Sequence, residues 1–169
     1  MPAIESNHRT QVLEAIADNL IASKCRLATA ESCTGGGIAK ALTELSGSSS
    51  WYQGGVVSYS NSLKQNLLCV TTGSLENYGA VSEEVAREMA EGVATTANSD
   101  FAVSTTGIAG PDGGSVDKPV GTVCFGFYCA GVTLVETKIF PGDRRKVREA
   151  TIDYALTRLL ELITAKKSG

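Results

Sequence analysis

An uncharged and largely apolar stretch of the chain, residues 120–135, constrains the fold more than any other segment. Glycine and threonine interrupt its apolar residues, and its 16 residues are too few for a transmembrane helix. A continuous apolar run such as 120–129 is typical of a central β-strand. Ala130-Gly131 is expected to join this strand to a second, half-exposed strand over 132–140. The core should therefore contain a sheet with an antiparallel hairpin.

Helical and extended patterns alternate along the rest of the chain. Apolar residues at helical spacing predict helices over roughly 8–23, 38–45, 62–68, 83–97 and from 144 to the C-terminus, with Ser82 and Asp143 as caps. Further strands are expected at 26–30, 51–59 and 101–105. This order predicts an α/β fold, a three-layer α/β/α sandwich with a mixed sheet. Without a repeat or a boundary, residues 1–169 are expected to form a single domain.

The composition indicates a soluble domain that depends on an apolar core. With 43% hydrophobic residues in 169, the chain needs neither disulfides nor a structural metal for stability. A net charge of −3 argues against a general nucleic-acid binder. The five cysteines are scattered, which favours reduced thiols, and residues 1–10 carry no secretory signal. We expect a cytoplasmic protein that binds neither nucleic acid nor membrane.

The scarcity of histidine limits the possible chemistry. His8 is the only histidine and lies near the N-terminus. A His-rich metal site is therefore excluded, and a Ser-His-Asp triad would depend on a frayed segment. A serine hydrolase built on this chain needs a base other than histidine.

A polar, glycine-rich turn at 31–37 supplies candidate nucleophiles. Ser32 lies between a strand and a helix, where free backbone N–H groups and the helix dipole can stabilise an oxyanion. The alternative is that Ser32 or Thr34 simply caps the helix. Cys33 is a competing nucleophile, because a helix N-terminus lowers a thiol pKa; the alternative is a small packing residue.

A serine without histidine needs a deprotonated lysine. Lys64 follows a strand and a segment that contains Tyr59, Ser60 and Asn61 as hydrogen-bonding groups. Burial or a neighbouring cation would have to lower its pKa. The alternative interpretation is an ordinary solvated lysine.

Two further segments could bind a ligand. Residues 143–148 place four cations at a helix N-terminus, where an anion would offset their unfavourable interaction with the dipole. Arg144 is the best ligand candidate, whereas Arg145, Lys146 and Arg148 are expected on a solvated face paired with acidic neighbours. The expected loop from Thr106 through Gly107, Ile108 and Ala109 to Gly110 follows a buried strand, and its glycines would allow close approach of a small molecule. Its alternative is an ordinary surface turn.

Six segments in order, spanning about residues 8–163, resemble one known family. They are Ala30–Gly36, Tyr59–Asn61 with Lys64, Gly79–Ser82, Thr106–Gly114, Lys118–Val123 and Gly142–Arg144. Together they are similar to the C-terminal domain of the competence/damage-inducible protein CinA. This resemblance implies an amidohydrolase that converts nicotinamide mononucleotide to nicotinic acid mononucleotide and ammonia in pyridine nucleotide salvage. It also implies a homodimer and requires no metal or cofactor.

The resemblance further implies roles for individual residues. Ser32 would be the nucleophile and Lys64 the general base, with backbone N–H groups of Cys33, Thr34 and Gly35 around the oxyanion. Substrate would contact Tyr59, Asn61, Thr106, Gly107, Ile108, Ala109, Gly110 and Arg144, with Arg144 meeting the phosphate. Two alternatives remain: a catalytically silent nucleotide-binding or regulatory domain, and hydrolysis through Cys33.

Overall fold

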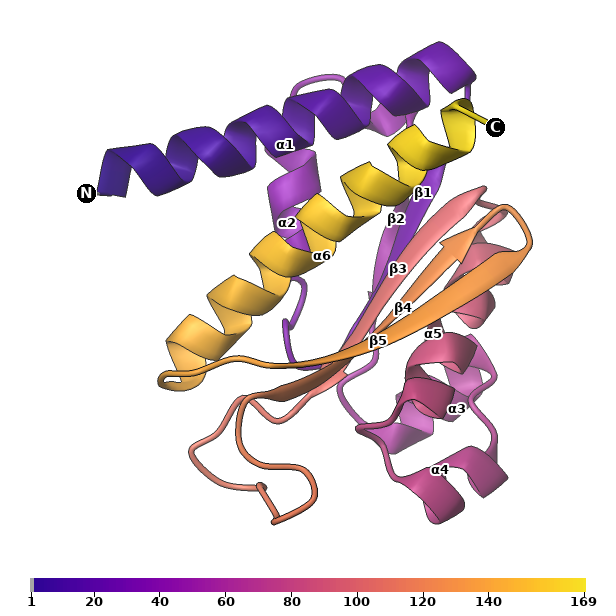
Figure 1. The fold of residues 1–169 in the computed structure, drawn as a ribbon. Coiled ribbons are helices and arrows are strands. Elements are labelled where there is room, and N and C mark those ends of the chain that lie inside the picture. The colour runs from indigo at the N-terminus through magenta and orange to yellow at the C-terminus, as the bar shows by residue number, and fades with distance from the viewer. Residues whose placement is uncertain (1) are drawn as a thin grey trace.

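A mixed, five-stranded sheet forms the middle layer of the protein (Figure 1). The computed structural model describes residues 2–169, with side chains from residue 7 onward. The strands are β1 (Leu27–Glu31), β2 (Tyr52–Val57), β3 (Phe101–Gly107), β4 (Thr122–Cys129) and β5 (Val132–Ile139). The helices are α1 (Pro2–Ser23), α2 (Gly37–Thr43), α3 (Asn61–Leu68), α4 (Thr72–Tyr78), α5 (Glu83–Ala97) and α6 (Arg144–Lys167), with a 3-10 turn η1 (Ser48–Ser50).

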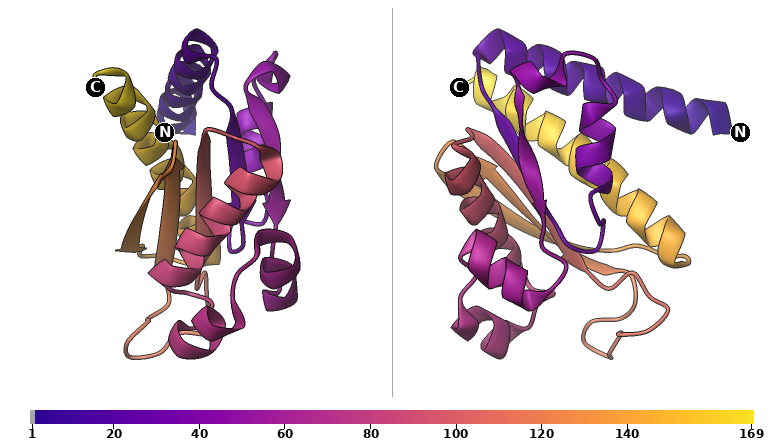
Figure 2. Two further views of the ribbon diagram at one scale, coloured as in Figure 1. Left: turned by 90° about the vertical axis from the view of Figure 1, so that its right-hand side faces the viewer. Right: turned by 180° about the vertical axis from the view of Figure 1, so that it is seen from behind.

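Helices cover both faces of the sheet, as Figure 2 shows from two further sides. Helices α1, α2 and α6 pack on one face with Leu27, Val103 and Phe125. Helix α5, with the end of α3, packs on the other face over Ala28 and Ala30. Successive strand residues point to opposite faces, so β1 serves both cores. The predicted three-layer α/β/α sandwich is confirmed.

The sheet combines parallel and antiparallel pairs in the order β2-β1-β3-β4-β5. Strands β2, β1 and β3 are parallel, and β4 and β5 continue the sheet in antiparallel pairs. The β4–β5 hairpin turns at Ala130 and Gly131 with φ values of 47° and 98°, which is typical of a two-residue type I′ turn. The predicted hairpin and the half-exposed edge strand are therefore confirmed.

Several element boundaries differ from the sequence prediction. Strand β3 extends to Gly107 because Thr106 and Gly107 pair with Cys124 and Val123 of β4, so the first two residues of the expected loop are strand. Helix α1 begins at Pro2, before the predicted residue 8. Helix α4 has no predicted counterpart, because its seven residues carry too few apolar side chains to form a periodic pattern. The prediction that residues 1–10 carry no secretory signal lies partly outside the described residues, which lack Met1 and the side chains of residues 2–6.

None of the helices within residues 2–169 is long and apolar enough to cross a bilayer.

A close contact between two helices positions α3 on α5. A Cβ at Gly92 of α5 would lie 2.0 Å from the carbonyl oxygen of Leu68, the last residue of α3. Glycine is therefore required at this point, although it is a poor helix former. Because α3 carries Lys64, this contact also determines where the lysine lies.

We expect Gly92→Ala to destabilise the protein by about 1–3 kcal/mol, because the added methyl group meets backbone rather than a flexible side chain. Gly73→Ala in α4 is the matched control, because the nearest atom to its Cβ is 4.0 Å away. There the better helix propensity of alanine should stabilise by up to about 1 kcal/mol. Urea unfolding of both variants measures these differences, and an unchanged midpoint for Gly92→Ala would contradict the close contact.

Candidate active site

Three parallel strands end at the same edge of the sheet, and the candidate site lies there. Ser32 follows β1 and continues its pairing, since its N–H donates to the Thr105 carbonyl at 2.9 Å. Ser58 follows β2 and donates its N–H to the Glu31 carbonyl at 2.8 Å. Thr106 lies near the end of β3. Crevices at the carboxyl ends of parallel strands are the usual ligand sites of open α/β sheets.

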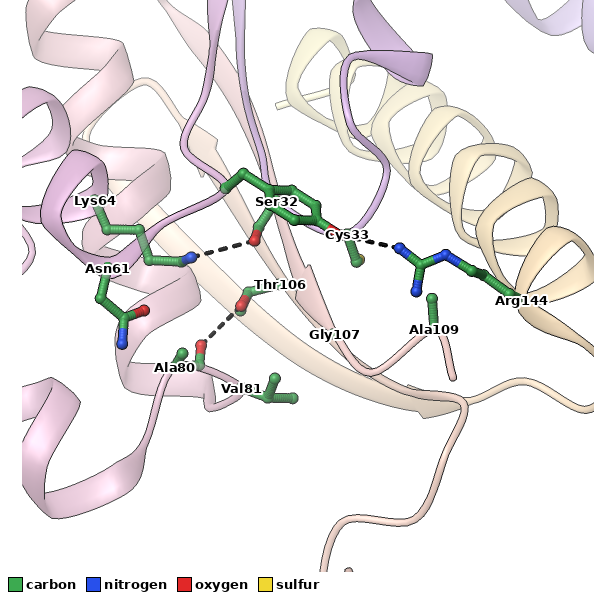
Figure 3. Close-up of a pocket in the computed structure, with 11 residues that line it drawn as sticks. Ser32, Cys33, Asn61, Lys64, Ala80, Val81, Thr106, Gly107, Ala109 and Arg144 are labelled. Atoms are coloured by element: carbon green, nitrogen blue, oxygen red, sulfur yellow. Dashed lines mark hydrogen bonds between the residues drawn. The ribbon is translucent and has the colours of Figure 1, made fainter. Parts of the chain in front are cut away.

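Lys64 reaches this edge from α3 and contacts Ser32 (Figure 3). Its Nζ donates to Ser32 Oγ at 3.1 Å and to the Ser58 carbonyl at 3.0 Å. The residue is only 2% exposed, so the interpretation as a solvated lysine is wrong. Burial lowers the pKa of the Lys64 ammonium below its ordinary value, because the charged form loses solvation. A neutral amine at this distance can accept the Ser32 hydroxyl proton.

Glu31 occupies the helix N-terminus that was expected to serve Ser32. Its side chain is buried and accepts from the N–H groups of Ile38 at 2.8 Å and Ala39 at 3.0 Å. The N-cap position is Gly36, which has no side chain to contribute. The alternative that Ser32 or Thr34 caps α2 is therefore wrong, and the Glu31 carboxylate lies at the positive end of the α2 dipole. An acidic residue directly before a glycine-rich turn was the available signal for Glu31.

The turn between Ser32 and α2 leaves three backbone donors free. The Gly35 N–H donates to the Ser32 carbonyl at 3.0 Å, so the expected role of Gly35 as an oxyanion donor is wrong. The N–H groups of Cys33, Thr34 and Gly36 donate to no other residue in the described chain. Thr105 anchors the turn through its own hydroxyl, which is hydrogen-bonded to that of Thr34 at 2.8 Å. The N–H groups of Cys33 and Thr34 directly follow the serine in the chain, and free donors of this kind can bind an oxyanion.

Cys33 is buried in the core that faces α6. Burial raises the pKa of the Cys33 thiol to about 12, because the thiolate would lose its solvation. A protonated thiol is a poor nucleophile. The packing alternative for Cys33 thus agrees with the structure, and the cysteine-based mechanism loses its physical basis.

Arg144 connects α6 to two other parts of the site. Its Nη2 donates to the Tyr59 hydroxyl and its Nη1 to the Gly110 carbonyl, both at 2.9 Å. Tyr59 is 61% exposed and lines the opening. The Asn61 side chain has no hydrogen-bond partner within the described residues. These groups leave an exposed aromatic face, a free amide and a guanidinium around one opening.

A cavity of about 220 Å³ collects most of the predicted site residues. Its lining comprises Ser32, Cys33, Tyr59, Asn61, Lys64, Ala80, Val81, Thr106, Gly107, Ala109 and Arg144. Ile108 and Gly110 do not line it, although the Gly110 carbonyl holds Arg144; Thr34 and Gly35 line a different cavity. Ala80 and Val81 had no predicted role. The sequence feature that could have indicated them is the family-like segment 79–82. The Thr106 hydroxyl donates to the Ala80 carbonyl in this segment at 2.7 Å.

No group of three or more His, Cys, Asp or Glu side chains in the described part of the chain is arranged to hold a metal ion.

Comparison with known proteins identifies the family. The model of the CinA C-terminal domain matches residues 9–163. The chain belongs to the CinA C-terminal domain family. The nicotinamide-nucleotide amidohydrolase PncC of Enterobacter agglomerans is 55% identical over 136 residues, which cover 79% of this chain and 83% of that protein.

Longer proteins and solved structures also match this CinA domain. A CinA-like protein from Leptospira biflexa is 43% identical over 156 residues, and the chain spans only 37% of its length. The crystal structure of a CinA superfamily protein from Enterobacter cloacae superposes with a TM-score of 0.89 at 35% identity, covering 92% of each chain. The resemblance drawn from the six sequence segments is therefore confirmed.

The state of Cys33 can be tested by alkylation of the native protein. Iodoacetamide at pH 8 should modify the exposed Cys69 readily and leave Cys33 unmodified until the chain unfolds, since its buried thiol stays protonated. Mass spectrometry of native and urea-unfolded samples measures both sites. Rapid modification of Cys33 in the native protein would contradict this expectation and revive the thiol as a nucleophile.

Proposed function

We propose that this chain hydrolyses the carboxamide of nicotinamide mononucleotide to nicotinic acid mononucleotide and ammonia, in pyridine nucleotide salvage. The observation that carries the proposal is the 3.1 Å contact between Lys64 Nζ and Ser32 Oγ in the wall of the cavity. The 55% identity to a named nicotinamide-nucleotide amidohydrolase supports the substrate. In a member of this family, a buried lysine beside a serine hydroxyl provides the base and the nucleophile that amide hydrolysis requires when no histidine is present.

The reaction begins at the Ser32 hydroxyl. Neutral Lys64 takes the hydroxyl proton while Ser32 Oγ attacks the amide carbon, and the N–H groups of Cys33 and Thr34 bind the developing oxyanion. Protonated Lys64 then donates its proton to the departing nitrogen, so that ammonia leaves and an acyl-serine remains. Lys64, neutral again, removes a proton from water, which attacks the acyl carbon. Lys64 then returns this proton to Ser32 Oγ as the acyl–oxygen bond breaks, so that the acid is released and the free serine is restored. One oxyanion donor of this kind is typically worth roughly 2.7–4 kcal/mol.

The outer part of the cavity fits the remainder of the nucleotide. The exposed face of Tyr59 can stack on the cationic pyridinium ring, and the unpartnered Asn61 amide can hydrogen-bond the carboxamide or the ribose. Arg144 lies at the same opening, where its remaining N–H groups can bind the phosphate. The substrate would then lie with its amide at Ser32 and its anionic end at α6.

A silent binding domain is the competing reading, and the burial of Lys64 argues against it. An ammonium group that is almost fully enclosed destabilises the folded chain unless it is neutral or paired. A module that only binds nucleotides gains nothing from that cost. Free thiols at all five cysteines favour the cytoplasm as the compartment. The single domain and the homodimer stay predictions.

Ammonia release from nicotinamide mononucleotide tests the proposed pair. Ser32→Ala and Lys64→Met should each lower the rate by about 10³-fold or more, since one removes the nucleophile and the other its base. Ser49→Ala and Lys40→Met replace exposed residues of the same types and should retain the wild-type rate. Circular dichroism verifies that all four variants fold. Full activity of either site variant would contradict the mechanism.

The pH dependence of kcat/KM should report the Lys64 amine. Because only neutral Lys64 can accept a proton, and burial lowers its pKa, activity should rise with pH along a limb whose midpoint lies below 10.5. Measurements above pH 7 avoid titration of the substrate phosphate, whose second pKa is about 6. Lys64→Arg should be inactive at every pH, because a guanidinium does not lose its proton. A midpoint at or above 10.5 would refute a buried lysine base.

A further inference from the structure

Helix α6 contacts the back of the turn that follows Ser32. Arg148 Nε donates to the Cys33 carbonyl at 3.2 Å, and its Nη2 donates to the Thr34 carbonyl at 3.3 Å. Arg148 and Gly35 line a second cavity of about 390 Å³, whose lining shares no residue with that of the cavity at Lys64. The expectation that Arg148 lies on a solvated face paired with an acidic neighbour is therefore wrong.

The charge of Arg148 is directed at backbone rather than at a carboxylate. Glu149, its expected partner, pairs instead with Arg9 at 2.8 Å. Arg148 forms no ion pair within the described residues. A guanidinium without a carboxylate partner retains its full donor strength for the two carbonyls that it contacts.

The turn packs directly against this guanidinium. A Cβ at Gly35 would lie 3.3 Å from Nη2 of Arg148, and Gly35 has a positive φ of 59°. One turn further along α6, a Cβ at Gly37 would lie 2.5 Å from Cδ1 of Ile152. The glycines thus let the turn approach α6 closely enough for Arg148 to reach its carbonyls.

Peptide geometry transmits this contact to one free backbone donor, the Thr34 N–H. The Cys33 carbonyl and the Thr34 N–H belong to one planar trans peptide and point in opposite directions. Holding the carbonyl toward α6 therefore directs the Thr34 N–H away from Arg148. A cation on the carbonyl also polarises the peptide, which strengthens its N–H as a donor.

We propose that Arg148 is a positioning residue that orients and polarises the Cys33–Thr34 peptide as part of the oxyanion site. This inference rests on the proposed amidase function. Arg148 does not touch the substrate in this arrangement, because it acts from the opposite side of the turn. Its loss should therefore weaken stabilisation of the transition state and leave ground-state binding intact.

The kinetic test compares Arg148→Met and Arg148→Lys with Arg145→Met. Arg145 lies one turn earlier on α6, is exposed and makes no hydrogen bond or ion pair in the described structure, so it is the matched control. Arg148→Met should lower kcat for ammonia release by roughly 10²-fold, with KM within about twofold and the Lys64 pH midpoint unchanged. Arg148→Lys keeps the positive charge but not the planar guanidinium, so its kcat should lie between that of Arg148→Met and that of the Arg145→Met control. A parallel loss of melting temperature, kcat and substrate affinity would instead indicate a purely structural role.

Chemical rescue separates a missing donor from a damaged fold. In Arg148→Ala, methylguanidinium should enter the second cavity and raise kcat in a saturable way, whereas methylammonium, which lacks the planar fork, should raise it less. The Arg145→Met control should not respond to either ion. Equal rescue by both ions would overturn the bidentate role.

An NMR measurement without substrate tests whether Arg148 positions the turn. In Arg148→Met, the backbone amide signals of Thr34 and Gly35 should shift and exchange faster than in the wild type, whereas Arg145→Met should leave them in place. Unchanged amides would overturn the inference whatever the activity. If the wild type releases no ammonia but these amides shift, the proposed function fails and the positioning of the turn stands.

Discussion

The burial of one lysine side chain is the interaction on which the rest of the site depends. Lys64 is enclosed by its own helix, the end of β2 and the turn after β1, and its Nζ is held by Ser32 and the Ser58 carbonyl. Enclosure disfavours the ammonium form and so prepares the amine to accept a proton. The close packing of α3 at Gly92 keeps the lysine in this position, which links helix packing directly to acid–base chemistry.

The turn between β1 and α2 divides its hydrogen-bonding groups between structure and chemistry. Glu31 satisfies the first N–H groups of α2, and Gly35 closes the turn onto Ser32. Among the N–H groups left without a partner in the described chain, those of Cys33 and Thr34 directly follow the serine. Their carbonyls are held by Arg148 from the other side, so the turn is fixed at both faces without using the donors that a reaction needs. A rigid turn of this kind can bind an oxyanion without reorganising, which is the condition under which such donors are most effective.

Much of the fold could be predicted because its signals are local. The apolar run at 120–129, the Ala130-Gly131 turn and the caps at Ser82 and Asp143 each produce the expected element. Predictions failed where a distant partner decides the outcome. Pairing with β4 extends β3 through Thr106, and long-range contacts change the expected surroundings of Lys64 and Arg148. Charge patterns favour solvated side chains at both positions, since spacing along the chain carries no information about which backbone carbonyls lie across the fold.

The sequence by itself determined the alternation of elements, the absence of a usable histidine and the residue types gathered in the six segments that mark the CinA family. Local propensity and composition are sufficient for these conclusions because they depend on neighbouring residues alone. Only the tertiary structure decided that Lys64 meets Ser32, that Glu31 rather than Ser32 caps α2, and that Arg148 holds the turn from behind. Each of these contacts joins residues from different elements, and their geometry is set by how the helices pack on the two faces of the sheet.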